Sequence, residues 1–183
     1  KWVLAEGSDS SGMTRSIPIE KILDDCMVAW AMNGEALRPE QGYPVRLIVP
    51  GWEGNMWVKW LRRLEFGDKP YMTREETSKY TDLLSDGKAR MFTWVMEAKS
   101  VITSPCPEKP ILSKGIHQIR GLAWSGRGKI KRVDVSIDGG KNWTTAKLHS
   151  PILSKSLTRF TLPLNWNGEE LLLQSRAIDE TNY

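Results

Sequence analysis

Two basic side chains lie within otherwise apolar stretches of the first half of the sequence. Arg46 lies in the run 45–49, and Lys59 lies in the run 57–61. A cation on an apolar strand must reach solvent or meet an anion, because burying an unpaired charge costs free energy. Arg46 and Lys59 are therefore candidates for binding a phosphate or a carboxylate in a common pocket. The alternative is that both side chains extend to solvent or pair with a nearby acidic side chain.

The elements that would position these cations are short. Residues 45–49 alternate and end at Pro50-Gly51, which predicts a buried strand followed by a turn, and residues 57–61 are a second strand candidate. The first half also contains an apolar run at 2–5, a polar loop at 7–12, a helical turn over 17–23, a turn at Asn33-Gly34, and a polar segment at 73–84 that fits either helix or loop.

The second half has a different pattern. Residues 104–110 contain three prolines, which predicts a domain junction, and we expect domains at 1–98 and 99–183. The runs typical of short strands are 116–123, 131–137, 143–148, 156–162 and 170–178. Asp138-Gly139-Gly140 supplies a hairpin turn after the alternating run 131–137, so this half predicts a small β-sandwich.

Composition excludes several classes of protein. The chain has 183 residues, with 26 Lys plus Arg against 22 Asp plus Glu, and the net charge of +4 is scattered along the sequence, so neither nucleic acid nor a membrane is an expected partner. No apolar stretch approaches the roughly 20 residues of a membrane helix. Cys26, Cys106, His117 and His149 are too few and too dispersed for a zinc site or a disulfide scaffold, so no metal ligands are expected in this chain.

Several ordered motifs resemble the sulfite oxidase family of molybdopterin enzymes. MNGEAL at 32–37, GYPVRLIVPG at 42–51 and VKWL at 58–61 are similar to its molybdopterin domain. GLAWSG at 121–126 and RVDVSIDGGKNW at 132–143 are similar to its dimerisation domain. EETSKYTD at 75–82 and FTWVMEAKSVIT at 92–103 resemble the branch formed by the bacterial sulfane dehydrogenases.

The resemblance implies an α+β chain. Residues 1–98 would be the C-terminal part of a molybdopterin-binding domain, and residues 99–183 an all-β, immunoglobulin-like dimerisation domain that lacks its last strand. The chain is therefore expected to be a C-terminal fragment that is inactive alone. The cysteine that binds molybdenum in the family is expected upstream, because neither Cys26 nor Cys106 stands in its place.

The resemblance also assigns cofactor-binding roles. Arg46 and Lys59 would bind the pterin and its phosphate, with the backbone of Trp57 and Val58 alongside. Asp9 matches the region of a cofactor-contacting aspartate, where its carboxylate could accept hydrogen bonds from pterin N–H groups. A loop aspartate also commonly closes a turn, and that alternative stays open for Asp9.

Two further positions follow from the same resemblance. Tyr80 aligns with the active-site tyrosine, whose phenol can donate a hydrogen bond to an oxo group or a substrate oxygen. Gln41 stands where many members carry a histidine, so a hydrogen bond to the cofactor stays possible but a positive charge does not. Without the resemblance, Tyr80 would be read as a surface residue of a polar segment.

The implied function is oxidation of reduced sulfur by a molybdenum–molybdopterin cofactor. The expected substrate is sulfane sulfur on a carrier protein, and the expected partners are a c-type cytochrome that accepts electrons and a second copy of the chain, bound through residues 99–183. The expected location is the periplasm. The alternatives are a sulfite dehydrogenase and a non-catalytic homodimerisation module, in which Trp124 and Trp143 serve either an interface or the sandwich core.

Overall fold

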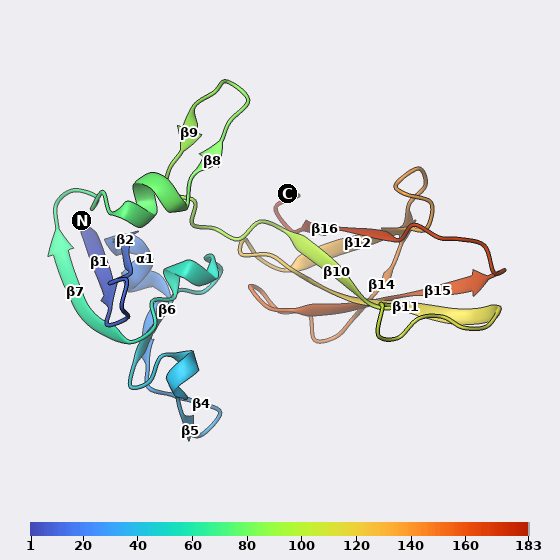
Figure 1. Ribbon diagram of the computed structural model, residues 1–183, viewed down its shortest axis with the longest axis horizontal. Coiled ribbons are helices and arrows are strands. Elements are labelled where there is room, and N and C mark those ends of the chain that lie inside the picture. Colours follow the sequence, from blue (N-terminus) through green and yellow to red (C-terminus); the bar gives the residue numbers. More distant parts are fainter. Residues whose placement is uncertain (183) are drawn as a thin grey trace. The chain divides into compact units, whose positions relative to one another are not determined.

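The computed structural model describes residues 1–182 and divides into two compact units, one of Lys1–Val95 and one that begins at Met96 (Figure 1). Tyr183, the last residue of the expected dimerisation domain, lies outside the described residues. The regular secondary structure of both units is mainly β-strand, and the only α-helix in the described part of the chain is α1. No helix within residues 1–182 has both the length and the apolar character needed to cross a membrane.

The first unit is built from short antiparallel pairings. Its central sheet has the order β2-β1-β7, and two-stranded pairs join β3 to β6, β4 to β5 and β8 to β9. The elements are β1 (Trp2–Gly7), β2 (Thr14–Pro18), α1 (Ile19–Asp24), β3 (Met27–Ala29), β4 (Ala31–Met32), β5 (Glu35–Ala36), η1 (Pro39–Gln41), β6 (Arg46–Ile48), η2 (Gly54–Met56), β7 (Leu61–Gly67), the π-helical turn η3 (Glu75–Lys79), β8 (Asp82–Leu83) and β9 (Ala89–Arg90).

The core of the first unit holds the segments around β6 and η2 in place. Its buried members are Ala5, Ile17, Leu47, Val49, Trp52, Met56 and Val58. Trp94 packs against this core, and its ring stacks on that of Trp52 with centroids 4.8 Å apart and planes inclined by 5°. Buried side chains anchor the backbone of β6 and of the segment that follows η2. The polar side chains that these segments carry, Arg46 and Lys59, are therefore held on a rigid backbone.

Two expectations for the first unit were correct in kind and wrong in extent, and a third was confirmed. The strand predicted at 45–49 is the three-residue β6. The helical turn predicted at 17–23 begins only at Ile19, because Ile17 is fully buried in β2 opposite Val3. The turn at Asn33-Gly34 is confirmed: both residues have positive φ, 53° and 84°, and they join β4 to β5.

The strand predicted at 57–61 was wrong. Trp57 closes the 3-10 turn η2, and Trp60 has a φ of +50°, a left-handed conformation that cannot continue a strand. Strand β7 therefore begins only at Leu61. The polar segment 73–84 is neither a full helix nor a loop, since it forms η3 and then β8.

The second unit contains two antiparallel sheets, of order β10-β11-β15-β14 and β13-β12-β16. The strands are β10 (Lys99–Ser104), β11 (Gly115–Trp124), β12 (Ile130–Ser136), β13 (Thr144–Thr145), β14 (Lys147–His149), β15 (Thr158–Trp166) and β16 (Gln174–Asp179). Side chains from both sheets form one core, which includes Ile119 and Phe160 from the first sheet and Val133 and Val135 from the second. The expected strand-rich second half is thus observed.

Trp124 and Trp143 do not fill this core. Both are only partly buried, and the indole N–H groups donate to the Met96 sulfur at 2.8 Å and to the Gly140 carbonyl oxygen at 3.0 Å. Arg176 lies over the Trp143 ring, with its guanidinium carbon 4.3 Å from the ring centroid. The alternative in which both tryptophans fill the sandwich core was therefore wrong, since neither belongs to the core or to the side chains packed against it.

Gly121 is required where β11 pairs with β15. It pairs with Phe160 across the two strands, and an added Cβ would overlap the Phe160 ring and the carbonyl oxygen of Val101. We predict that Gly121→Ala destabilises the second unit by about 1–3 kcal/mol, because this core has no room for another carbon. Urea denaturation of the full-length protein measures it. Gly54→Ala is the control, since Gly54 has open space at its Cβ position, and equal denaturation midpoints for the two variants would contradict the prediction.

Asp9 closes the loop between β1 and β2. Its carboxylate accepts hydrogen bonds from the Ser11 hydroxyl at 2.7 Å and from the Met13 N–H at 2.8 Å, and these bonds lower the pKa of Asp9 below its ordinary value of 3.8. A carboxyl with a lowered pKa stabilises the folded state above its unfolded pKa, and that contribution is lost as the pH falls through the folded value.

We therefore predict that the Met13 amide resonance titrates with a midpoint below pH 3.8. ¹⁵N-methionine NMR of the full-length protein measures this midpoint. The Asp9→Asn variant should abolish the titration, because its amide does not ionise in this range. A midpoint at or above 3.8 would contradict the assignment.

Candidate functional site

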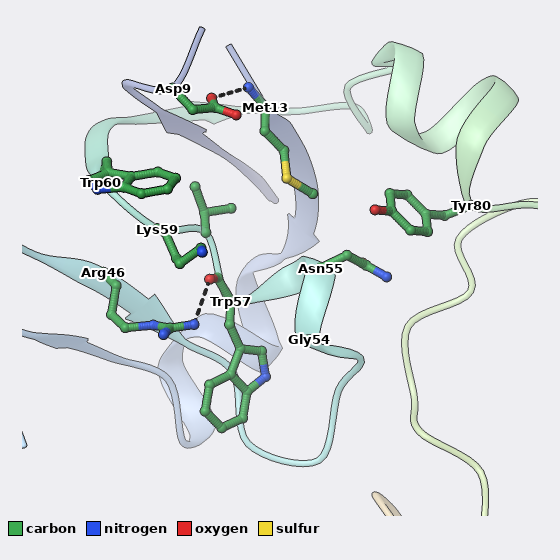
Figure 2. Close-up of a pocket in the computed structure, with 10 residues that line it drawn as sticks. Asp9, Met13, Arg46, Gly54, Asn55, Trp57, Lys59, Trp60 and Tyr80 are labelled. Atoms are coloured by element: carbon green, nitrogen blue, oxygen red, sulfur yellow. Dashed lines mark hydrogen bonds between the residues drawn. The ribbon is translucent and has the colours of Figure 1, made fainter. Parts of the chain in front are cut away.

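A cavity of about 330 Å³ opens in the first unit beside β6 and β7 (Figure 2). It is lined by Asp9, Met13, Arg46, Gly54, Asn55, Trp57, Val58, Lys59, Trp60 and Tyr80. Six of the seven residues singled out from the sequence therefore meet at one cavity. The seventh, Gln41, is not among the residues that line it.

Arg46 reaches the cavity from β6 and is held by backbone carbonyl groups. Its two terminal nitrogens donate to the carbonyl oxygens of Gln41 at 2.9 Å and Trp57 at 3.0 Å. The Nε atom is buried and has no hydrogen-bond partner. Burial lowers the pKa of Arg46, although a guanidinium remains charged at any physiological pH. The site thus holds a fixed positive charge with an unused donor.

Lys59 lies at the same cavity, on the segment between η2 and β7. Its ammonium group donates to the Glu40 carbonyl oxygen at 2.9 Å and lies 4.7 Å from the centroid of the Trp60 ring. The aromatic face and the carbonyl dipole stabilise the cation without neutralising it. Figure 2 shows the side chain directed into the cavity.

Neither cation is paired with an acid. Within residues 1–182, no carboxylate lies within ion-pair distance of Arg46 or Lys59, and the only carboxylate that lines the cavity belongs to Asp9. The alternative that these cations pair with a nearby acidic side chain was therefore wrong. A partly desolvated site with two uncompensated positive charges attracts an anion.

Gly42 allows the two cations to approach the same space. It adopts a φ of +106°, and an added Cβ would lie 2.8 Å from the Cβ of Lys59. Its carbonyl oxygen accepts the N–H of Trp60 at 3.4 Å. A larger residue at this position would strain the backbone and displace Lys59.

The side chains of Asp9 and Gln41 both make local hydrogen bonds, and for Asp9 these agree with the turn alternative. Both Asp9 carboxylate oxygens already accept hydrogen bonds within their own loop, so Asp9 shapes the rim as a turn residue. The Gln41 side chain accepts the N–H of Arg38 at 3.0 Å, and only its backbone carbonyl reaches Arg46. The Gln41 side chain does not line the cavity, and its backbone carbonyl is the group that contacts Arg46. The hydrogen bond from the Gln41 side chain to the cofactor stays a prediction.

Trp57 and Val58 form one wall of the cavity. The Trp57 indole N–H donates to the Trp52 carbonyl oxygen at 3.1 Å, and the Val58 carbonyl oxygen accepts the N–H of Leu47 at 2.9 Å. Val58 is only 2% exposed. These contacts fix the backbone between the two cations, so that the wall is rigid.

Tyr80 closes the side of the cavity opposite Lys59, and Figure 2 shows its hydroxyl directed inward. The residue follows η3, and its N–H donates to the Glu75 carbonyl oxygen at 2.9 Å. The guanidinium carbon of Arg15 lies 4.6 Å from the centroid of its ring. Tyr80 is partly buried, so its reading as a plain surface residue was wrong.

Four cavity residues had not been singled out from the sequence: Met13, Gly54, Asn55 and Trp60. The doublet Lys59-Trp60 carried a signal for one of them, since a cation beside an aromatic residue is a possible cation–π pair. Asn55 and Met13 carried none, because their position depends on contacts made by distant segments.

Metal ligands and cysteines do not add to this site. Among the described residues, no group of three or more His, Cys, Asp or Glu side chains is placed to hold a metal ion. Cys26 packs against the core of the first unit, and Cys106 lies in the second unit. Neither cysteine lines the cavity.

Comparison with known proteins places each half of the chain in a family. Residues 1–75 match the model of the oxidoreductase molybdopterin binding domain, and residues 90–183 match that of the Mo-co oxidoreductase dimerisation domain. The crystal structure of the sulfane dehydrogenase SoxCD from Paracoccus pantotrophus is similar, with a TM-score of 0.95 and 65% identity, over all of this chain and 47% of that one.

Curated relatives are more distant in sequence. The mitochondrial sulfite oxidase of Drosophila melanogaster is 35% identical over 81% of this chain, and the NADH nitrate reductase of Cichorium intybus is 34% identical over 78%. The aligned regions span 29% and 18% of those two proteins. The shared cofactor of this family is molybdenum–molybdopterin. The chain therefore belongs to the molybdenum-cofactor oxidoreductases that include sulfite oxidase, and it carries sequence of both their molybdopterin-binding and their dimerisation domains.

Proposed function

We propose that this chain forms part of an enzyme that oxidises sulfane sulfur carried on the thiol of a carrier protein. The similarity to the Paracoccus pantotrophus sulfane dehydrogenase supports this substrate, because 65% identity is well above the 34–35% identity to nitrate reductase and sulfite oxidase. The observation that carries the proposal is the cavity, where two unpaired cations face a tyrosine hydroxyl.

The cavity fits the phosphorylated tail of a pterin. Arg46 has a buried Nε–H without an acceptor, and Lys59 brings a second charge to the same space. A phosphate dianion would accept from both, replacing carbonyl oxygens with a full negative charge. The backbone of Trp57 and Val58 lies alongside, and Asp9 holds the rim loop in shape. In this proposal Gln41 acts through its carbonyl group, which orients Arg46.

Tyr80 is the proposed catalytic residue of this chain. When bound, the molybdenum cofactor supplies two-electron oxygen-atom transfer. Tyr80 would donate its phenolic hydrogen bond to an oxygen at the reacting centre and so orient it. The partly buried position of the ring favours such a bond, because water competes less there for the hydroxyl.

The second unit is proposed to assemble the enzyme. Its match to a dimerisation domain supports a homodimer formed through this unit. Two sheets that enclose one core support an immunoglobulin-like sandwich. In the same proposal, the electron acceptor is a c-type cytochrome and the enzyme is located in the periplasm. We also propose that this chain alone is inactive. The runner-up is a sulfite dehydrogenase, and the other alternative is a non-catalytic dimerisation module.

The cofactor role of the two cations is tested by the double variant Arg46→Ala/Lys59→Ala in the full-length protein. We expect molybdenum content to fall at least tenfold at limiting cofactor, because each lost charged contact contributes about 1.5–3 kcal/mol. Metal analysis measures the occupancy, and thermal unfolding of the cofactor-free protein reports on the fold. The control is Lys88→Ala/Arg90→Ala, which removes two exposed cations outside the cavity. Full molybdenum content in the first variant would remove both residues from the site.

The substrate is tested by assaying the full-length protein with carrier-bound persulfide, free sulfite and nitrate. We expect turnover with the carrier-bound substrate and reduction of a c-type cytochrome. Rapid oxidation of free sulfite alone would favour the runner-up, and nitrate reduction alone would favour the activity named for the plant relatives. No turnover of any of the three by a molybdenum-loaded protein would support the non-catalytic alternative.

A further inference from the structure

A buried ion pair lies directly behind Tyr80. Arg15 in β2 and Glu76 in η3 are both fully buried. The Nε and one terminal nitrogen of Arg15 donate to the two carboxylate oxygens of Glu76, at 2.9 and 3.2 Å. The backbone N–H of Ser16 donates to the same carboxylate at 3.0 Å. The guanidinium is thus held by a bidentate contact that leaves it little freedom to rotate.

The other end of the guanidinium reaches the cavity wall. A terminal nitrogen of Arg15 donates to the side-chain oxygen of Asn55, which lines the cavity together with Tyr80. The Asn55 amide group in turn donates to Glu53 at 3.0 Å. The Asn55 side chain is therefore oriented from both sides, and it connects Arg15 to the cavity wall.

The ring of Tyr80 rests on this fixed cation. The guanidinium carbon of Arg15 is 4.6 Å from the ring centroid, within the range in which a cation is attracted to an aromatic face. Because Arg15 is fully buried, water screens this attraction weakly. The attraction therefore favours one placement of the ring, the one that directs the hydroxyl into the cavity.

The backbone that carries Tyr80 is fastened to the same strand. Glu75 accepts a hydrogen bond from the Thr14 hydroxyl at 3.2 Å, and Glu76 binds Arg15, so neighbouring acids of η3 bind neighbouring residues of β2. The π-helical turn then ends with the bond from the Tyr80 N–H to the Glu75 carbonyl oxygen. Turns of this kind are rare and often occur at functional sites.

We propose that Arg15 is a positioning residue for Tyr80, which it holds with its hydroxyl in the cavity through its ring contact and through its pair with Glu76. The inference rests on the proposed function for the role of Tyr80. A buried ion pair commonly adds no stability over apolar residues of the same size, whereas removal of one partner is costly. We therefore expect the fold to survive replacement of Arg15 and Glu76 together. An effect of this double change on Tyr80 then reports on the position of its ring and not on loss of the fold.

The structural test uses full-length, cofactor-free protein with ¹³C-labelled tyrosine. The Tyr80 ring resonance is assigned by its loss in Tyr80→Phe. In the double variant Arg15→Met/Glu76→Met we expect this resonance to shift and broaden, because the ring loses the cation that holds it. The matched control is Arg90→Met/Asp82→Met, which removes an exposed ion pair from the hairpin that follows Tyr80. An unchanged Tyr80 resonance in the folded Arg15→Met/Glu76→Met protein would overturn the proposal.

The kinetic test uses the molybdenum-loaded enzyme. We expect Arg15→Met/Glu76→Met to lower kcat about thirtyfold, the size of a desolvated cation–π contact, with molybdenum content unchanged. In the Tyr80→Phe background the same double change should lower kcat no further, because Arg15 acts through the hydroxyl of Tyr80. An equal loss in both backgrounds would mean a general structural role and would overturn the proposal.

The two tests also separate this inference from the proposed function. If Tyr80→Phe alone leaves kcat unchanged, the proposed role of Tyr80 in turnover is wrong. The ring resonance of the cofactor-free protein still decides whether Arg15 positions Tyr80. If Arg15→Met/Glu76→Met fails to fold, Arg15→Lys replaces it: the ammonium keeps a charge opposite Glu76 but loses the bidentate fork, so the resonance is expected to shift.

Discussion

The structure of the candidate site depends on a charge that the described residues leave uncompensated. Arg46 is partly buried, its contacts are to neutral carbonyl groups, and its Nε has no acceptor. An arrangement of this kind is unfavourable unless an anion completes it. Lys59 and the cavity wall are arranged around the same space. The site therefore attracts an anion because the fold places no acidic side chain of the described residues beside Arg46.

Two arginines of the first unit illustrate opposite uses of the same side chain. Arg15 is fully buried and paired with Glu76, so the pair as a whole carries no net charge and the geometry of Arg15 is fixed. Arg46 has no acidic partner within residues 1–182 and faces the cavity. The paired arginine suits positioning, and the unpaired arginine suits binding.

Backbone conformation determines how closely the cations approach one another. The left-handed conformation of Trp60 delays the start of the strand to Leu61, and Gly42 leaves room for the Lys59 side chain. Alternation at 131–137 predicted the position of β12 well, because local period-two patterning is enough to indicate a strand. It did not reveal that Asp134 and Ser136 are buried like Val133 and Val135, so that both faces of this part of β12 are covered. The error at 57–61 arose because a single positive φ is set by tertiary contacts, which an apolar run does not reveal.

By itself, the sequence determined several of the short strands, the turn at Asn33-Gly34 and the family motifs that pointed to Arg46, Lys59 and Tyr80, since these depend on neighbouring residues. Only the tertiary structure decided which charges are paired. Arg15 and Glu76 are 61 positions apart, and nothing local indicates that they meet beneath Tyr80. Pairing and burial depend on groups that come together only when the chain folds, so the electrostatics of the site could not be read from the order of its residues.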